Sequence, residues 1–165
     1  MEIQKLSQDD LDSIARLISS VAEADIFPYF CEQGRAEFQT RVLPDLNTIL
    51  TESNYLSVKA VISGDIVGVA ALRNADYLTH LFVSKSCQGK GVGKALLDYV
   101  VKETQAKQVS LRSSINAVSF YESLGFKRTG EEGDYNGIRF MPMTLDLSKP
   151  ENSKAEQSRI ENENT

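Results

Sequence analysis

The sequence predicts an α/β domain built on one mixed sheet, with helices on both faces. A strand, a glycine-rich loop, a helix and a second strand follow one another between residues 77 and 113, which is the order of a parallel crossover unit. Strand hairpins before and after this unit add antiparallel neighbours to the sheet. The length of 165 residues and the 41% hydrophobic content suit one domain with one sizeable core.

The first part of the chain predicts two helical regions followed by a hairpin. In order, we expect a strand at 2–6, an amphipathic helix after it, a helical region at about 35–51, and hairpin strands at 55–62 and 66–72. Ser7 or Asp9 is placed to cap the first helix. Proline removes a helical N–H donor, so Pro44 predicts a break in the second helical region.

The second part of the chain continues the alternation. We expect a strand at 77–84, a helix at about 92–104, a strand at 108–113, a short helix at 116–124, and strands near 126–129 and 138–147. Gly125 ends the short helix in a left-handed cap position. Beyond Pro150 the chain is polar, with Ile160 its single large aliphatic residue. We therefore expect a domain at 1–148 and a disordered tail at 149–165.

Composition excludes several classes of function. The net charge of -5 argues against a duplex nucleic-acid partner. Cys31 and Cys87 form no CxxC pair and His80 is the one histidine, so no metal site is expected. The N-terminus lacks the pattern of a signal peptide, and no apolar stretch reaches 18 residues. We expect a cytoplasmic protein with no membrane partner, as a monomer or a homodimer.

Three alternating glycines stand directly ahead of the predicted helix at 92. Gly89, Gly91 and Gly93 let the backbone turn its N–H groups toward a ligand, and the helix start adds unpaired donors and partial positive charge. Together these features form a receptor for phosphate, to which Lys90 and Lys94 add charge. The alternative is a turn that only leads a strand into a helix.

The two commonest nucleotide-binding loops do not fit this cluster. The dinucleotide pattern GxGxxG read from Gly89 requires glycine at position 94, where the chain has Lys94. A Walker A loop requires glycine at 88 and Ser or Thr at 95, where the chain has Gln88 and Ala95.

A different pattern, Gln/Arg-x-x-Gly-x-Gly/Ala, is filled by Gln88, Gly91 and Gly93. The segment 81–83 (LFV) stands just upstream, and residues 117–126 (AVSFYESLGF) follow downstream. In this order the three segments resemble the GNAT N-acetyltransferase superfamily, over roughly residues 2–147. The resemblance implies a mostly antiparallel twisted sheet with a central, splayed parallel strand pair. It also implies acetyl-CoA as acetyl donor and an amine of a small molecule or protein as acceptor.

The resemblance assigns the cofactor contacts. The pyrophosphate falls to backbone N–H groups of the loop, which consists of Gln88, Gly89, Lys90, Gly91, Val92, Gly93 and Lys94. The pantetheine arm falls to the free strand edge at Leu81, Phe82 and Val83. Ser114 stands where the family often has a cofactor-contacting asparagine, and Asn116 follows two residues later. Either a hydroxyl at 113–114 replaces that contact, or Asn116 simply caps the next helix.

Two residues are candidates for proton transfer. Tyr121 matches the family's general acid, since a phenol with a reference pKa of about 10 keeps its proton at neutral pH. The alternative is that its ring only fills the core. His80 is a candidate base, but strand alternation places 77, 79, 81 and 83 on one face and His80 on the other, unless a bulge re-aims it. It is otherwise a packed, hydrogen-bonded histidine, and Glu23, Asp25 and Glu32 are other possible bases.

The acceptor site falls to the N-terminal helices, the linker at 27–30 and the hairpin near 135–140. The aromatic residues of these segments line either a pocket or the core: Phe27, Tyr29, Phe30, Tyr135 and Phe140. The acidic turn with Glu131, Glu132 and Asp134 receives a cationic amine or is a solvated hairpin tip. Two other functions stay open: a sensor that binds acetyl-CoA without turnover, and a nucleotide-dependent kinase or oxidoreductase.

Overall fold

The computed structural model describes residues 1–148, and the predicted tail lies outside these residues. Its sheet has eight strands in the order β1-β2-β3-β4-β5-β8-β6, with β7 paired to β8. The elements run β1 Glu2–Lys5, α1 Leu11–Val21, α2 Glu32–Thr51, β2 Tyr55–Ile62, β3 Asp65–Arg73, β4 Tyr77–Val83, α3 Val92–Glu103, β5 Gln108–Ser113, α4 Val118–Ser123, β6 Lys127–Arg128, β7 Gly133–Tyr135 and β8 Ile138–Asp146.

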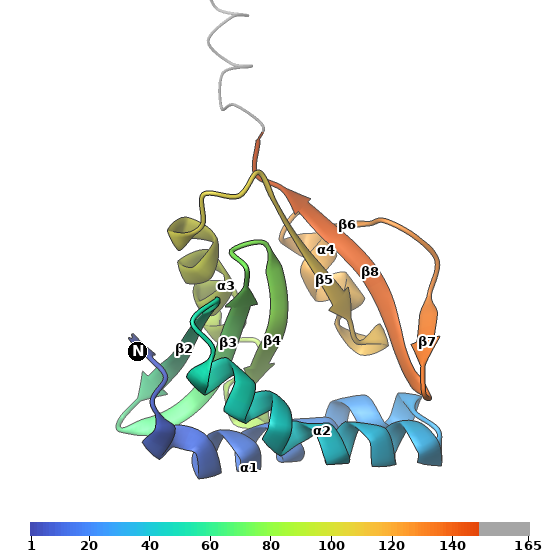
Figure 1. Ribbon diagram of the computed structural model, residues 1–165, viewed down its shortest axis with the longest axis horizontal. Helices are drawn as coiled ribbons and strands as arrows, with labels where there is room; N and C mark the ends of the chain where they lie inside the picture. The colour runs from blue at the N-terminus through green and yellow to red at the C-terminus, as the bar shows by residue number, and fades with distance from the viewer. Residues whose placement is uncertain (149–165) are drawn as a thin grey trace, which may run out of the picture.

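One parallel strand pair lies at the centre of the sheet. β4 runs parallel to β5, whereas every other strand pair within residues 1–148 is antiparallel. The parallel register holds only at Tyr77 with Ser110 and at Leu78 with Leu111. Beyond that point β4 and β5 diverge (Figure 1). The predicted mixed sheet with a splayed parallel pair is confirmed.

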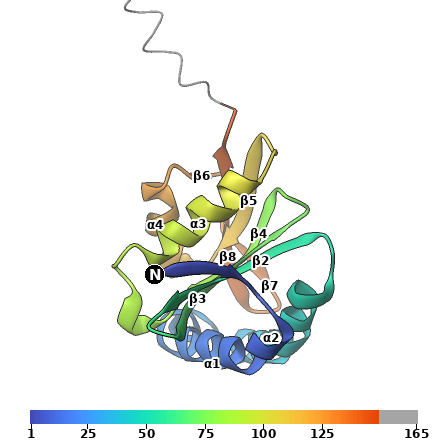
Figure 2. The same cartoon turned by 90° about the vertical axis from the view of Figure 1, so that its left-hand side faces the viewer.

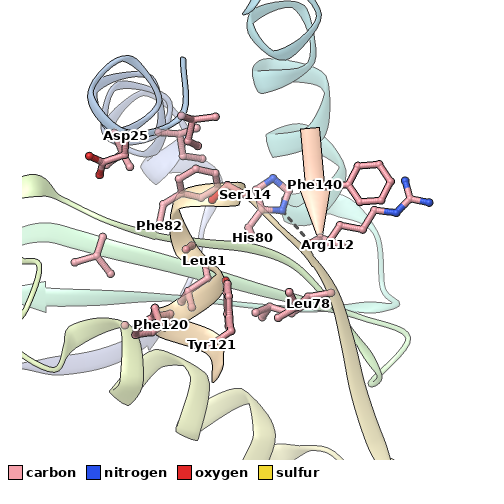
Figure 3. A pocket seen from close by; sticks show the side chains of 18 of the residues that line it. Asp25, Leu78, His80, Leu81, Phe82, Arg112, Ser114, Phe120, Tyr121 and Phe140 are labelled. Atoms are coloured by element: carbon pink, nitrogen blue, oxygen red, sulfur yellow. Dashed lines mark hydrogen bonds between the residues drawn. The ribbon is translucent and has the colours of Figure 1, made fainter. Parts of the chain in front are cut away.

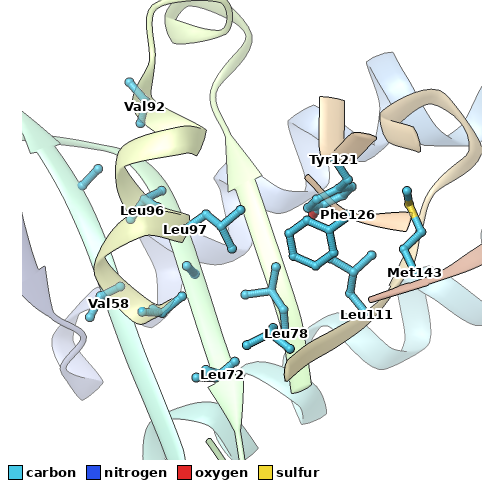
Figure 4. Packing of buried hydrophobic residues seen from close by; sticks show 14 of the residues in the cluster. Val58, Leu72, Leu78, Val92, Leu96, Leu97, Leu111, Tyr121, Phe126 and Met143 are labelled. Carbon is cyan, nitrogen blue, oxygen red and sulfur yellow. The ribbon is translucent and has the colours of Figure 1, made fainter. Parts of the chain in front are cut away.

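The helices cover the two faces of the sheet. α1 and α2 lie on one face, and α3 and α4 lie on the other (Figures 1 and 2). The larger core cluster lies under α3 and α4 (Figure 4). The buried residues of α3 are Val92, Leu96, Leu97 and Val100, at the helical spacing predicted for one apolar face. Each such side chain contributes roughly 1.5–3 kcal/mol of hydrophobic stabilisation when fully buried.

The predicted break at Pro44 is wrong. α2 is continuous from Glu32 to Thr51, with Pro44 inside it. Tertiary packing outweighs the local cost of the proline, because Gly34 on one side of it and Leu46 and Ile49 on the other are all buried. None of the helices within residues 1–148 combines the length and apolarity needed to cross a bilayer.

The end of α1 also differs from the prediction. A π-helical turn at Ala22–Ile26 follows α1 directly, and a 3-10 turn at Phe27–Tyr29 contains Pro28. Such π turns often occur at functional sites, and this one brings Asp25 toward the glycine loop. At the start of the chain a 3-10 turn at Gln8–Asp10 precedes α1, and Ser7 occupies its cap position, where the Ser7 N–H donates to the Asp10 carboxylate at 2.9 Å. Asp10 occupies the cap position of α1 itself, so the prediction that Ser7 or Asp9 caps this helix is wrong.

Candidate active site

A cleft of about 750 Å³ is lined by β4, β5, the glycine loop and helices from both layers. It includes the part of β4 that β5 leaves unpaired. Every residue predicted for the site lines this cleft except Lys90. The predicted residues that line the cleft are Tyr121, His80, Leu81, Phe82, Val83, Gln88, Gly89, Gly91, Val92, Gly93, Lys94, Ser114 and Asn116.

The glycine loop presents a run of free backbone donors. The N–H groups of residues 89–94 have no hydrogen-bond acceptor within residues 1–148, and the first loop-to-helix bond is donated by Ala95 to the Gly91 carbonyl at 3.0 Å. Gly89 and Gly91 hold φ of 74° and 84°, a region that favours glycine. A Cβ added at either would meet nothing within 4 Å, so open space lies in front of the loop. Unpaired donors at a helix start attract anions.

Neither lysine of the loop is placed as a dedicated phosphate ligand. Lys94 pairs with Asp98 one helical turn later at 2.5 Å, and both side chains are largely exposed. Lys90 is exposed and does not line the cleft. The backbone, rather than either lysine, is therefore what this loop offers to a phosphate.

Gln88 ties the start of the loop to the opposite layer. Its side-chain amide donates to the Asp25 carboxylate and to the Val83 carbonyl, each at 3.0 Å, and Lys85 Nζ lies 2.6 Å from Asp25. Burial works to raise the pKa of the Asp25 carboxyl, but hydrogen bonds from Lys85 and Gln88, together with the positive charge of Lys85, hold it below its ordinary value. Asp25 is thus a structural residue, paired with Lys85 and Gln88, rather than a free base. Glu23 and Glu32 do not line the cleft.

A bulge in β4 determines the direction of His80. Ala71 of β3 pairs with His80 and Leu72 pairs with Leu78, so Thr79 is the extra residue. The predicted alternation therefore fails at Thr79 but holds beyond it, where Leu81 and Val83 lie on one face and His80 lies on the other with Phe82. Leu78, Leu81 and Val83 pack in the core under α3, whereas Phe82 packs on the α1 side.

The hydrogen bonds of His80 define its tautomer. The Thr79 hydroxyl donates to the Ala71 carbonyl at 3.2 Å, so its oxygen accepts from His80 Nδ1–H at 2.9 Å. This leaves Nε2 as the acceptor nitrogen of the ring. Burial lowers the pKa of His80 from its ordinary 6.5 to about 4, so the imidazole is neutral near pH 7.

Tyr121 fills the core and also borders the cleft. Its ring packs edge-on against Phe120 and Phe126, with centroids 5.1 and 5.4 Å away, and lies beside Leu81 (Figure 3). Its hydroxyl makes no hydrogen bond within residues 1–148. Burial raises the pKa of the phenol above its ordinary value, so it keeps its proton. In this position the Tyr121 ring can fill the core while its hydroxyl is available as a proton donor.

The loop after β5 contributes the last two predicted contacts. The buried Ser113 hydroxyl is occupied, since it donates to the Ser114 carbonyl at 2.7 Å. Asn116 lies inside the 3-10 turn Ile115–Ala117, and Ala117 occupies the cap position of α4. Asn116 therefore does not cap the helix, and Ser114 and Asn116 both line the cleft.

The predicted acceptor residues divide into two groups. Phe30, Tyr135 and Phe140 line the cleft, whereas Tyr29 is exposed and Phe27 packs against Phe38. The acidic turn at 131–134 does not line the cleft. Its members are used locally, because Glu132 pairs with Arg139 at 2.6 Å and Asp134 accepts from the Gly137 N–H at 2.8 Å. A role for this turn in receiving a cationic amine is not supported.

A protein-family model described as the Acetyltransferase (GNAT) domain matches residues 26–147 of the sequence. The chain belongs to the GNAT acetyltransferase family. It is 30% identical over 109 residues to a probable spermine N(1)-acetyltransferase from Bacillus subtilis subsp. natto (strain BEST195). This alignment covers 55% of this chain and 71% of the relative.

Solved GNAT structures share the fold. A GCN5-related N-acetyltransferase from Rhodopseudomonas palustris aligns with TM-score 0.76 and 22% identity, over 88% of this chain and 95% of that chain. PaiA N-acetyltransferase from Thermoplasma acidophilum, in complex with coenzyme A, aligns with TM-score 0.69 and 21% identity, over 88% and 98%. An aminoglycoside 6'-N-acetyltransferase complexed with coenzyme A aligns with TM-score 0.68 and 16% identity, over 91% and 99%.

Sequence reasoning missed four arginines that also line the cleft: Arg41, Arg73, Arg112 and Arg139. They come from α2, β3, β5 and β8, so no local motif joins them. Strand alternation was the one sequence pattern that could have pointed to two of them. Arg73 and Arg112 lie in or next to predicted strands, and their neighbours Leu72 and Leu111 face the core. Alternation places the two arginines on the other face of the sheet.

Proposed function

We propose that this protein is an N-acetyltransferase that moves the acetyl group of acetyl-CoA directly to a primary amine. The observation that carries the proposal is the row of free N–H groups at 89–94, adjoining a β4 edge that β5 leaves unpaired from Thr79 to Val83. Family membership supports acetyl transfer. The acceptors in the relatives' names, spermine and aminoglycosides, are amines.

The residues present fit this cofactor. Free donors at a helix start suit a pyrophosphate, and the open space at Gly91 leaves room for it. The unpaired edge at Leu81, Phe82 and Val83 can pair with the amides of the pantetheine arm as an added strand does. The cofactor supplies an activated thioester. A backbone N–H from this edge is the proposed donor to the developing oxyanion, and such a donor contributes on the order of 3 kcal/mol to transition-state stabilisation.

The proton transfers fall to two side chains. A new N–C bond forms as the C–S bond breaks, so the nitrogen loses a proton and the departing sulfur gains one. We assign the sulfur's proton to the Tyr121 hydroxyl, which is protonated and unpaired within residues 1–148. His80 Nε2 is a neutral acceptor for an amine N–H. With a pKa of about 4 it does not keep the amine's proton near pH 7, so we assign it the role of orienting the nitrogen and passing that proton on to solvent water.

Two measurements test the proposal. Calorimetry with acetyl-CoA should show saturable binding at one site per chain. Thiol release over a panel of primary amines should then exceed the amine-free background. Tight cofactor binding without thiol release for any amine would favour the sensor, and binding of ATP or NAD that coenzyme A does not displace would favour a nucleotide-dependent enzyme.

A further inference from the structure

We infer that the acceptor amine carries an anionic group, a carboxylate or a phosphate, which is held by Arg73 and Arg112. The inference rests on the proposed function and deepens it by naming a substrate class. It starts from a contrast in charge: the whole chain has a net charge of -5, yet the part of the cleft away from the glycine loop is cationic.

This cationic part of the cleft lies beyond His80. Figure 3 shows Arg112 and Phe140 at the opposite end of the pocket from Asp25, with His80 between them. Apart from Asp25 and Lys94, the charged residues that line the cleft are Arg41, Arg73, Arg112 and Arg139, against one carboxylate, Asp45. The acceptor therefore enters a cleft whose lining carries four guanidinium groups.

Two of the four arginines already have carboxylate partners. Arg41 lies 2.7 Å from Glu37, and Arg139 lies 2.6 Å from Glu132. Arg73 and Arg112 have no ion pair and no side-chain hydrogen bond within residues 1–148. These two guanidinium groups are consequently the free cations of the cleft.

Aromatic rings hold both free arginines in place. The guanidinium of Arg73 lies 4.8 Å from the centre of the Tyr77 ring, and that of Arg112 lies 4.4 Å from the centre of the Phe140 ring. Stacking occupies the flat face of a guanidinium and leaves its N–H edge free. A free, pre-oriented edge of this kind matches the two oxygens of a carboxylate or phosphate.

Sheet register brings the two arginines to the same face. Arg73 pairs with Tyr77 across β3 and β4, and Tyr77 pairs with Ser110 across β4 and β5. Arg112 lies two residues beyond Ser110, where β4 and β5 diverge, so the two Cα atoms are separated by roughly 12 Å or more. Arginine side chains span much of that distance, so one small anion can contact both.

The acidic groups do not favour a polycation. Asp25 is paired with Lys85, and the turn at 131–134 lies outside the cleft lining. Asp45 remains, and burial raises the pKa of its carboxyl although the charge of nearby Arg41 opposes this shift. One carboxylate cannot balance two unpaired arginines, so a polyamine such as spermine is a poor fit.

Matched acceptors and variants test the inference. The carboxylate set pairs glycine with methylamine, β-alanine with ethylamine and γ-aminobutyrate with propylamine. The phosphate set pairs phosphoethanolamine with ethanolamine, and spermine is tested as a polycation. Thiol release gives kcat/KM for each acceptor. We expect at least one anionic member to exceed its neutral partner by about tenfold or more, and the better of the two sets identifies carboxylate or phosphate as the ligand.

The variants Arg73→Gln and Arg112→Gln should raise KM for the preferred anionic acceptor by about tenfold or more, with a smaller change in kcat and none for neutral amines. Arg16→Gln, on the exposed face of α1 outside the cleft lining, is the matched control and should change neither value. Calorimetry of the coenzyme A-loaded protein with the anionic acceptors gives an affinity that does not depend on turnover.

Turnover of neutral amines or spermine in preference to every anionic amine would overturn the inference and leave the proposed function standing. An anionic preference that survives in the Arg73→Gln, Arg112→Gln double variant would also overturn it. Absence of turnover with every amine would count against the proposed function. In that case, binding of an anionic acceptor that depends on the two arginines would still support the anion site, and no binding would refute it.

Discussion

Replacing His80 with phenylalanine tests whether the surroundings hold the imidazole neutral. The ordinary pKa of 6.5 applies to the unfolded chain, whereas burial lowers the pKa in the folded protein to about 4. Between these values the unfolded chain binds a proton that the folded protein does not. The free energy of unfolding of the wild type should therefore fall as the pH is lowered from 6.5 toward 4, and this contribution is fully present only above the unfolded pKa.

The size of the effect follows from the two pKa values. A pKa difference of 6.5 against about 4, at 1.36 kcal/mol per unit, corresponds to about 3 kcal/mol over the whole window. At pH 5 the expected loss is about 2 kcal/mol. His80→Phe keeps a ring beside Phe82, whose centroid lies 6.2 Å from that of His80, but removes the titrating group.

Urea unfolding of both proteins measures the effect. Because the chain has no tryptophan, far-UV circular dichroism is the suitable signal. The carboxylates titrate in both proteins, so their contribution cancels in the difference, and the lost contact to Thr79 adds an offset that does not vary with pH. A difference in unfolding free energy that shifts by about 2 kcal/mol between pH 8 and pH 5 is expected. A constant difference would show that His80 titrates with its ordinary pKa in the folded protein and would refute the pKa reasoning.

Three further substitutions have defined outcomes. Gly91→Glu should abolish coenzyme A binding in calorimetry by placing a carboxylate before the free N–H groups, whereas Gly64→Glu, at a similar φ of 85° in a distant turn, should keep full affinity. Tyr121→Phe should lower kcat more than cofactor affinity, and unchanged turnover would mean that another group or water is the acid. Gly34→Ala should destabilise the fold by about 1–3 kcal/mol in urea unfolding, because its Cβ would lie 2.1 Å from the Gly137 carbonyl oxygen; an unchanged midpoint would contradict this close approach.

Local signals in the sequence predicted most of the elements. β2 and β5 match their predicted ranges, Tyr55–Ile62 and Gln108–Ser113, and α3 begins at Val92 as expected. These elements depend on glycine positions, turn-forming residues and the spacing of apolar residues. Each of these signals extends over only a few residues, so the sequence alone is enough to predict the elements. The glycine loop belongs to this class, because its free donors follow from the loop conformation and the helix start that it precedes.

Contacts between distant segments set the features that prediction missed. Pro44 lies inside α2 because packing on both sides of it outweighs the local cost. The bulge at Thr79 depends on the register between β3 and β4, and it places Leu78 on the same face as Leu81 and Val83, against the predicted alternation. The π turn that brings Asp25 to Lys85 and Gln88 joins residues about sixty positions apart.

The sequence by itself determined the family, the order of strands and helices and the loop at 88–94, since each depends on short-range patterns of glycine and apolar residues. Only the tertiary structure decided which charges meet in the cleft. Arg73 and Arg112 stand on different strands, and their stacking on Tyr77 and Phe140 arises once β3, β4, β5 and β8 pair in register. The character of the acceptor end is therefore a property of strand pairing, which no single segment encodes.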